Sequence, residues 1–204
     1  MNTLGHRELK KAKTKLECLS AMHTMSQNKS FKDIKVKDIA SAVGITEMTF
    51  FNYFKTKDEL LLYYMRMWCI DQMAVQIETP LKGYDAIHRI FIHTAHEIKT
   101  YPTIMLSLIG YIASLHEKPT LLTIEPAEIY LRHPNIVSLT NSDILNFDQL
   151  ILRHLQEMKL TLSLQETLNL LRSAFYGDAI NAHMTAQETE KLYELSLKNI
   201  FKGE

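Results

Sequence analysis

The fold is decided by residues 36–60, which read VKDIASAVGITEMTFFNYFKTKDEL. A short apolar stretch ends at Gly44, a residue suited to the left-handed conformation that closes helices. Thr46 then offers a side-chain oxygen that can accept hydrogen bonds from the first backbone N–H groups of a new helix. Thr56 and Glu59 have the spacing of a capping box, which predicts the start of a third helix. The sequence therefore predicts two short helices around a glycine turn, followed by a long helix.

Two short helices around a tight turn are typical of a helix-turn-helix, whose second helix enters the major groove of DNA. That second helix would begin at Thr46, and its outward side chains are short and polar. Tyr53 and Lys57 lie where they would hold phosphates at either side of the groove. Spacing alone leaves one alternative open, a surface helix whose polar face only meets water.

The charge distribution supports a polyanionic partner. The chain has 204 residues and a formal net charge of zero. Residues 1–57 carry eleven Lys or Arg against five Asp or Glu, whereas residues 58–204 carry twelve against eighteen. A basic head on an acidic body favours nucleic acid as the partner of the head. The alternative is that surface lysines only keep a short helical region in solution.

Composition narrows the class of protein. Six glycines and five prolines leave few turns, which favours an all-helical fold over a β-sandwich. The two cysteines fit a reducing compartment, and the N-terminus shows no apolar leader, so we expect a cytoplasmic protein. The longest apolar run, residues 103–115, is too short to span a membrane. No membrane partner is expected.

Residues 38–46, DIASAVGIT, and 49–60, TFFNYFKTKDEL, resemble the DNA-binding signature of the TetR family of transcriptional repressors. The resemblance covers about residues 5–65. It implies an all-α protein of about nine helices in two domains. A three-helix helix-turn-helix domain would occupy residues 1–55, and an effector-binding and dimerisation domain would occupy residues 56–204. The implied partners are an inverted-repeat operator in double-stranded DNA, a small-molecule effector and a second copy of the chain.

The recognition helix and its flanks supply the residues expected at the DNA. These are Lys35, Lys37, Thr46, Glu47, Met48, Thr49, Asn52, Tyr53 and Lys57. In the resemblance Lys57 meets a phosphate. Three positions depart from the family pattern: Met48 replaces a small residue, Phe51 replaces a tyrosine, and Lys35 replaces a capping Ser or Thr. A thioether at position 48 would be able to touch a thymine methyl group.

A lipophilic or aromatic ligand is expected in the body, because the family places its effector between the fourth helix and those after it. The residues expected to line this site are Tyr64, Trp68, His88, Phe91, Tyr101, Tyr111, Phe147, His154 and Phe175. Taken singly, each of these aromatic residues is also explained as ordinary core. The helix over residues 103–115 is apolar on nearly every side, which predicts burial on every side. A proline-rich connection, residues 118–141, follows it and is long enough to have a function.

The C-terminal helices are expected to form the dimer interface, as in the family's four-helix bundle. We predict helices from Ser142 and Asp143 to about Met158, from Ser163 to about Met184, and from a Thr185–Glu188 capping box to Phe201. The expected interface residues are Leu164, Leu168, Leu171, Phe175, Ala179, Ala182, Leu192 and Leu195. The alternative is that both helices only cover the core of a monomer.

The sequence thus predicts a DNA-binding repressor whose operator affinity falls when a ligand binds, with no cofactor and no enzymatic activity. One alternative is a regulator of the same fold that is controlled by a protein partner. Another is an all-helical metal-dependent enzyme that uses His93 and His96, which are three residues apart on one helical face.

Overall fold

The computed structural model describes residues 4–117, 120–136 and 145–202. Over these residues the chain forms ten α-helices and one 3-10 turn, η1, so the all-helical prediction is confirmed. In chain order they are α1 (His6–Ser26), η1 (Phe31–Asp33), α2 (Val36–Val43), α3 (Glu47–Phe51), α4 (Glu59–Glu78), α5 (Gly83–Thr100), α6 (Pro102–Ser114), α7 (Pro126–Arg132), α8 (Phe147–Leu155), α9 (Leu164–Thr185) and α10 (Thr189–Ile200).

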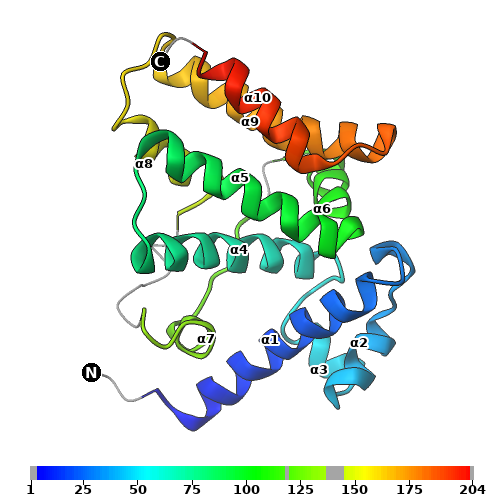
Figure 1. Cartoon of the computed structure of the whole chain (residues 1–204). Helices are drawn as coiled ribbons and strands as arrows, with labels where there is room; N and C mark the ends of the chain where they lie inside the picture. Colours follow the sequence, from blue (N-terminus) through cyan, green and yellow to red (C-terminus); the bar gives the residue numbers. More distant parts are fainter. Residues whose placement is uncertain (1–3, 118–119, 137–144, 203–204) are drawn as a thin grey trace.

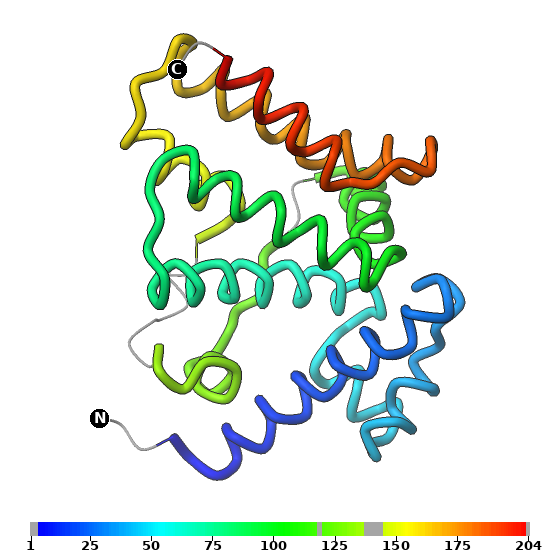
Figure 2. Tube along the Cα trace, viewed as in Figure 1, coloured from blue at the N-terminus to red at the C-terminus, as the bar shows by residue number. Residues whose placement is uncertain are grey.

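The helices form a head and a body (Figure 1). Helices α1, α2 and α3 gather at one end, and α4 leads from them into the middle of the molecule. Helix α5 runs obliquely beside α4, and the antiparallel pair α9 and α10 covers the side of α5 away from the head (Figure 2). The short α7 lies on the opposite side, against α1. Helix α4 is therefore in contact with both parts, and 13 of its 20 residues are buried.

Several predicted helix ends are confirmed by their capping contacts. Gly44 has a φ of 74° at the end of α2, and the Thr46 side chain accepts from Thr49 N at the start of α3. Ser163 caps α9 in the same way, accepting from Glu166 N. The predicted Thr56–Glu59 capping box is made only in part: Glu59 N donates to Thr56 Oγ1 at 3.2 Å, but the Glu59 carboxylate accepts from Lys55 N at 2.7 Å, and α4 begins at Glu59.

Two predicted helix starts are wrong. Thr185 does not open the last helix, because α9 continues through Thr185 and turns at Ala186, which has a φ of 55°. Helix α10 begins after Glu188 instead. Helix α8 begins at Phe147, where the Asn146 side chain accepts from Gln149 N at 2.9 Å. Ser142 and Asp143, the predicted cap, lie outside the described residues.

Helix α6 is not buried on every side, contrary to the prediction from its composition. Ile104, Met105 and Leu108 are buried, whereas Gly110 is exposed and Tyr111 is half-buried. The helix packs against the head and against α4, α5 and α9, and these neighbours leave part of its surface exposed. The apolar composition of this helix showed that it can be buried. It did not show how much of the helix surface the rest of the chain covers.

Candidate DNA-binding interface

The turn between α2 and α3 sets the direction of the second helix. Gly44 N donates to Ser41 O at 3.2 Å, and Ile45 N donates to Ala40 O at 2.9 Å, so the chain reverses tightly. A side chain at position 44 would be strained by the positive φ. Thr46 then resumes an extended conformation and starts α3. The turn's own backbone bonds thus set the direction in which α3 leaves α2.

Aromatic side chains anchor α3 to the core of the head. Phe50 and Phe54 are fully buried, with their ring centroids 5.3 Å apart, and Phe54 packs on the Tyr63 ring of α4 at the same separation. These contacts hold one side of α3 inward. The opposite side faces outward, and there Met48 and Asn52 are exposed.

Most of the predicted DNA-contacting side chains are accessible on this head. Lys35, Lys37, Thr46, Glu47, Met48 and Asn52 are exposed, and Thr49, Tyr53 and Lys57 are half-buried. The departure at position 35 has a structural consequence, since the Lys35 side chain caps nothing at the start of α2. Contact of these nine residues with DNA stays a prediction.

Lys57 differs from the rest, because its ammonium group is bonded inside the protein. Lys57 Nζ donates to the backbone carbonyl oxygens of Phe31 at 2.8 Å, Ile34 at 3.0 Å and Lys32 at 3.1 Å. It also lies 4.6 Å from the centre of the Phe31 ring. Burial lowers the pKa of this ammonium, and nearby carboxylates offset the shift only in part. All three N–H donors of the ammonium are thus used to tie the start of α4 to the η1 turn.

Short ion pairs fasten the head to α7, which sequence reasoning did not foresee. Lys11 and Lys15 on α1 pair with Glu125 and Glu128, each at 2.6 Å. The inner pair is buried, with the side chain of Lys15 8% exposed and that of Glu128 1% exposed. Lys15 also lies 4.6 Å from the centre of the Tyr63 ring of α4. The only hint in the sequence was the four-residue spacing of the lysines beside a three-residue spacing of the glutamates.

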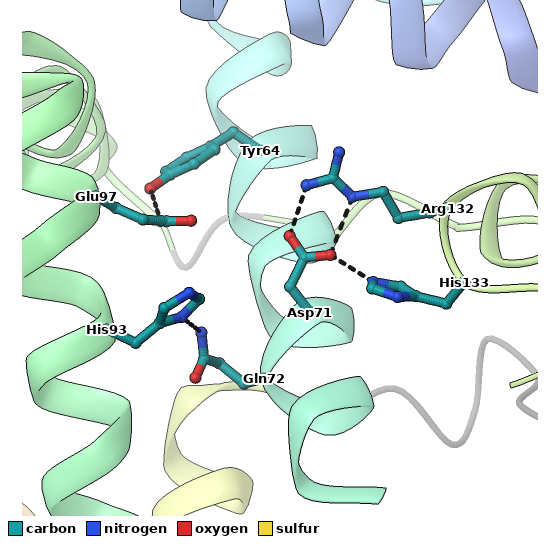
Figure 3. A network of polar contacts seen from close by, with 7 residues as sticks. All are labelled: Tyr64, Asp71, Gln72, His93, Glu97, Arg132 and His133. Atoms are coloured by element: carbon teal, nitrogen blue, oxygen red, sulfur yellow. Dashed lines mark hydrogen bonds and ion pairs between the residues drawn. The ribbon is translucent and has the colours of Figure 1, made fainter. Parts of the chain in front are cut away.

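The other end of α7 is held by a polar contact to α4 (Figure 3). Asp71 accepts from Arg132 Nε at 3.0 Å and Arg132 Nη2 at 2.9 Å, and its Oδ1 lies 2.6 Å from His133 Nε2. Burial by itself would raise the pKa of the Asp71 carboxyl, but the bonds from His133 and Arg132 hold it below its ordinary value. An aspartate in the largely apolar middle of α4 was the sequence signal for this site.

Two further polar pairs join α4 to α5 beside this contact (Figure 3). Tyr64 Oη donates to Glu97 Oε2 at 2.8 Å, and Gln72 Nε2 lies 2.6 Å from His93 Nδ1. Burial raises the pKa of the Glu97 carboxyl despite the bond from Tyr64. The body therefore contains a charged and polar region between α4, α5 and α7, in addition to its aromatic core.

The residues predicted to bind an effector fall into separate environments. Trp68, Phe91, Phe147 and Phe175 meet in one aromatic cluster, in which Phe147 and Phe175 are 4.4 Å apart and Trp68 and Phe175 are 5.8 Å apart. Their rings pack directly on one another.

The other predicted effector residues lie outside that cluster. Tyr64 and Tyr101 both contact His23 of the head, with Tyr101 stacked on it at 4.6 Å. His88 lines an open groove of about 500 Å³ along α5, and Tyr111 lines one of about 460 Å³ between α6 and the head. His154 is buried near Gln72. The structure thus brings four of the nine residues together and separates the other five.

The residues predicted at the dimer interface face mainly into their own subunit. Leu168, Leu171, Phe175, Ala179 and Ala182 are buried, Leu164 and Leu192 are half-buried, and Leu195 is 56% exposed. The apolar stripe of α9 packs on the core of the body, with Phe175 against Trp68, and contact of these eight residues with a second chain stays a prediction. The outer face of α9 carries exposed Leu170, Ile180 and Met184.

The metal-dependent alternative and the expectation of no membrane span can each be compared with the geometry. Among the described residues, no group of three or more His, Cys, Asp or Glu side chains is placed to hold a metal ion. His93 is bonded to Gln72, and His96 Nε2 lies 3.5 Å from Glu190 Oε2. Within the same described ranges, no helix is both long enough and apolar enough to cross a membrane.

The short helices, the glycine turn and the outward face of α3 have the geometry of a helix-turn-helix. Residues 20–64 match the family model of the bacterial regulatory proteins, tetR family. The match covers α2 and α3 with their flanking residues, so this part of the head is similar to the DNA-binding domain of that family. A search of curated protein sequences finds no match.

Solved structures with the same fold extend the similarity over the whole chain. FadR of Thermus thermophilus, a TetR-family repressor in complex with lauroyl-CoA, matches 93% of this chain and 94% of its own at 15% identity and a TM-score of 0.62. FadR of Bacillus subtilis with stearoyl-CoA matches 93% and 98%, at 15% identity and a TM-score of 0.56. A TetR regulator of Rhodococcus sp. RHA1 matches 96% and 99%, at 13% identity and a TM-score of 0.55. At these identities the likeness shows the fold.

Proposed function

We propose that this regulator is a homodimeric repressor that binds an inverted-repeat operator and releases it when a lipophilic ligand enters the body. The observation that carries the proposal is the anchoring of α3, whose inner side is locked by Phe50 and Phe54 while its outer side is exposed. A helix presented in this way can enter the major groove as a rigid reader. The cytoplasm, where the chromosome is accessible, is the corresponding location.

The head residues divide into three roles in this proposal. Lys35 and Lys37 are exposed at the start of α2 and would neutralise phosphates, which supplies affinity without sequence information. Glu47 and Asn52 are exposed on the outer side of α3 and would read base edges. Lys57 has no ammonium donor left for a phosphate, so we assign it to positioning the head.

The second copy would pack on the outer face of α9 and α10. Leu170, Ile180, Met184 and Leu195 are exposed on this pair, and large apolar side chains gathered on one surface favour association. Two heads related by a two-fold axis would then read two half-sites separated by about one helical turn or a multiple of it. In this arrangement residues 1–55 would bind DNA, and residues 56–204 would bind the effector and form the dimer.

The ligand proposal is supported by two proteins of the same fold that were solved with long-chain acyl-CoA esters. In this chain the apolar part of a ligand would enter beside Trp68 by separating the Phe147 and Phe175 rings. A ligand lowers DNA affinity only if it favours a form of the dimer that fits the operator less well. A coupling of about 1–3 kcal/mol would change operator affinity by about 5–150-fold.

The experiment selects duplexes from a randomised pool with the full-length protein and measures affinity against salt. If about eight phosphates are neutralised per dimer, log K falls against log salt with a slope of roughly −7. Asn52→Ala should change the selected bases, whereas Lys37→Ala should weaken all duplexes alike. Salt-independent binding, or the recovery of no duplex, would contradict the DNA-binding part.

The ligand part is tested separately with lauroyl-CoA and decanoic acid as probes. Each should quench the fluorescence of Trp68, the only tryptophan in the chain, and release the selected duplex. Release of DNA by a co-purifying protein, with no response to either probe or to a wider compound screen, would favour control by a protein partner.

A further inference from the structure

The recognition helix α3 has an apolar surface, formed by Met48 and Phe51, on the side that would face the bases. Most contacts of proteins with base edges are made by polar side chains. Met48 is 76% exposed and Phe51 is 45% exposed, and residues three apart on a helix share one side. The Phe51 ring is held edge-on against the buried Phe50 ring, with the centroids 5.6 Å apart. Met48 therefore lies on the same side of α3 as the Phe51 ring, which the buried Phe50 ring holds in place.

The hydroxyl groups beside this surface are bonded to each other. Thr46 Oγ1 accepts from Thr49 N at 3.1 Å and lies 2.9 Å from Thr49 Oγ1. These two hydroxyl groups are therefore already bonded within the first turn of α3. The most exposed apolar side chain on the outer face of α3 is that of Met48.

The major groove offers one apolar group to such a side chain. Thymine carries a 5-methyl group there, and the edges of the other three bases carry hydrogen-bond donors and acceptors. A methionine is unbranched and adjusts to the position of a small apolar partner. The basic charge of residues 1–57 and the match of residues 20–64 to a DNA-binding family make duplex DNA the occupant of this surface.

We propose that Met48, supported by Phe51, reads thymine methyl groups and makes thymine the preferred base at one or more positions of each half-site. This inference rests on the proposed entry of α3 into the major groove. It assigns part of the sequence specificity to an apolar contact between the Met48 side chain and a thymine methyl group, in addition to any hydrogen bonds to base edges.

The test removes the methyl group from the DNA and the thioether from the protein. In duplexes selected by the wild-type protein from a randomised pool, each thymidine is replaced in turn by deoxyuridine, which differs only by the methyl group. Burial of one such group corresponds to about fourfold in affinity, so symmetric replacement in both half-sites should cost about 15-fold. Met48→Ala should bind the thymidine duplex more weakly and show no further loss with deoxyuridine.

Two variants keep the test independent of folding. Met48→Leu retains an apolar contact and should retain the preference for thymidine. Leu162→Ala removes an exposed apolar side chain of the body, before α9, and should discriminate like the wild type. Because Met48 is exposed, its alanine variant should unfold at the wild-type temperature.

Each outcome decides the matter. Equal wild-type affinity for thymidine and deoxyuridine duplexes at every position overturns the inference and leaves DNA binding intact. An undiminished deoxyuridine penalty in Met48→Ala also overturns it, because the methyl group would then be sensed by another residue or through DNA shape. If no duplex is recovered at all, both the inference and the proposed function fail.

Discussion

Replacing Lys57 by methionine tests whether this residue positions the head or contacts DNA. The substitution keeps an unbranched side chain and removes the three bonds to the carbonyl oxygens of Phe31, Lys32 and Ile34. The bonds to Phe31 and Ile34 are part-buried, and a bond from a charged donor contributes about 1.5–3 kcal/mol. Since water replaces part of this loss, we expect the free energy of unfolding to fall by about 2–4 kcal/mol.

The expected effect on DNA binding separates the two roles. The η1 turn leads directly into α2, so Lys57→Met should loosen the helix-turn-helix and weaken binding to all duplexes alike. Its salt dependence should stay unchanged, because no phosphate contact is lost. A lost contact in each subunit would reduce the slope of log K against log salt by about 2.

Lys37→Ala is the matched control, since Lys37 is an exposed lysine at the start of α2. It should reduce the salt slope by about 2 and leave the free energy of unfolding unchanged. Chemical denaturation and fluorescence anisotropy between 50 and 200 mM salt (roughly the range over which such slopes are measured) give both quantities. A Lys57→Met protein of wild-type stability whose slope falls by about 2 would refute the positioning role.

The junction of head and body gives two more predictions. Glu128→Gln should destabilise the protein by about 3–5 kcal/mol in denaturant unfolding, because Lys15 would stay buried without its partner. The double variant Lys15→Met/Glu128→Met should recover most of that loss, and failure to do so would show that the pair also has a packing role. Burial, assisted by Arg132, lowers the pKa of His23 from 6.5 to about 4, so the unfolded chain binds the additional proton between these values. Stability should therefore fall as the pH drops, by about 2 kcal/mol between pH 7.5 and pH 5 from this group, and His23→Phe, which keeps an aromatic ring on Tyr101, should lack that share.

The sequence alone determined the head, because its signals act between residues close together in the chain. Gly44 adopts the left-handed conformation, and Thr46 caps the next helix through an N–H three residues away. Bonds of this kind form in any context that permits a helix, so their residue types can be identified without the fold. The outward face of α3 follows from the same local periodicity.

Only the tertiary structure decided what covers each apolar face and which charges meet. The stripe of α9 that contains Phe175 was correctly identified as apolar, and within the chain Phe175 packs on Trp68, a contact that the sequence pattern did not specify. Hydrophobic periodicity shows that one face of a helix must be buried. Because the hydrophobic effect is non-directional, the pattern does not show which element buries that face. The pairing of Lys15 with Glu128 spans more than a hundred residues of sequence and depends on where α7 returns to α1. Likewise Lys57 has the sequence context of a phosphate ligand, and only the return of the η1 turn to the start of α4 surrounds its ammonium with carbonyl oxygens.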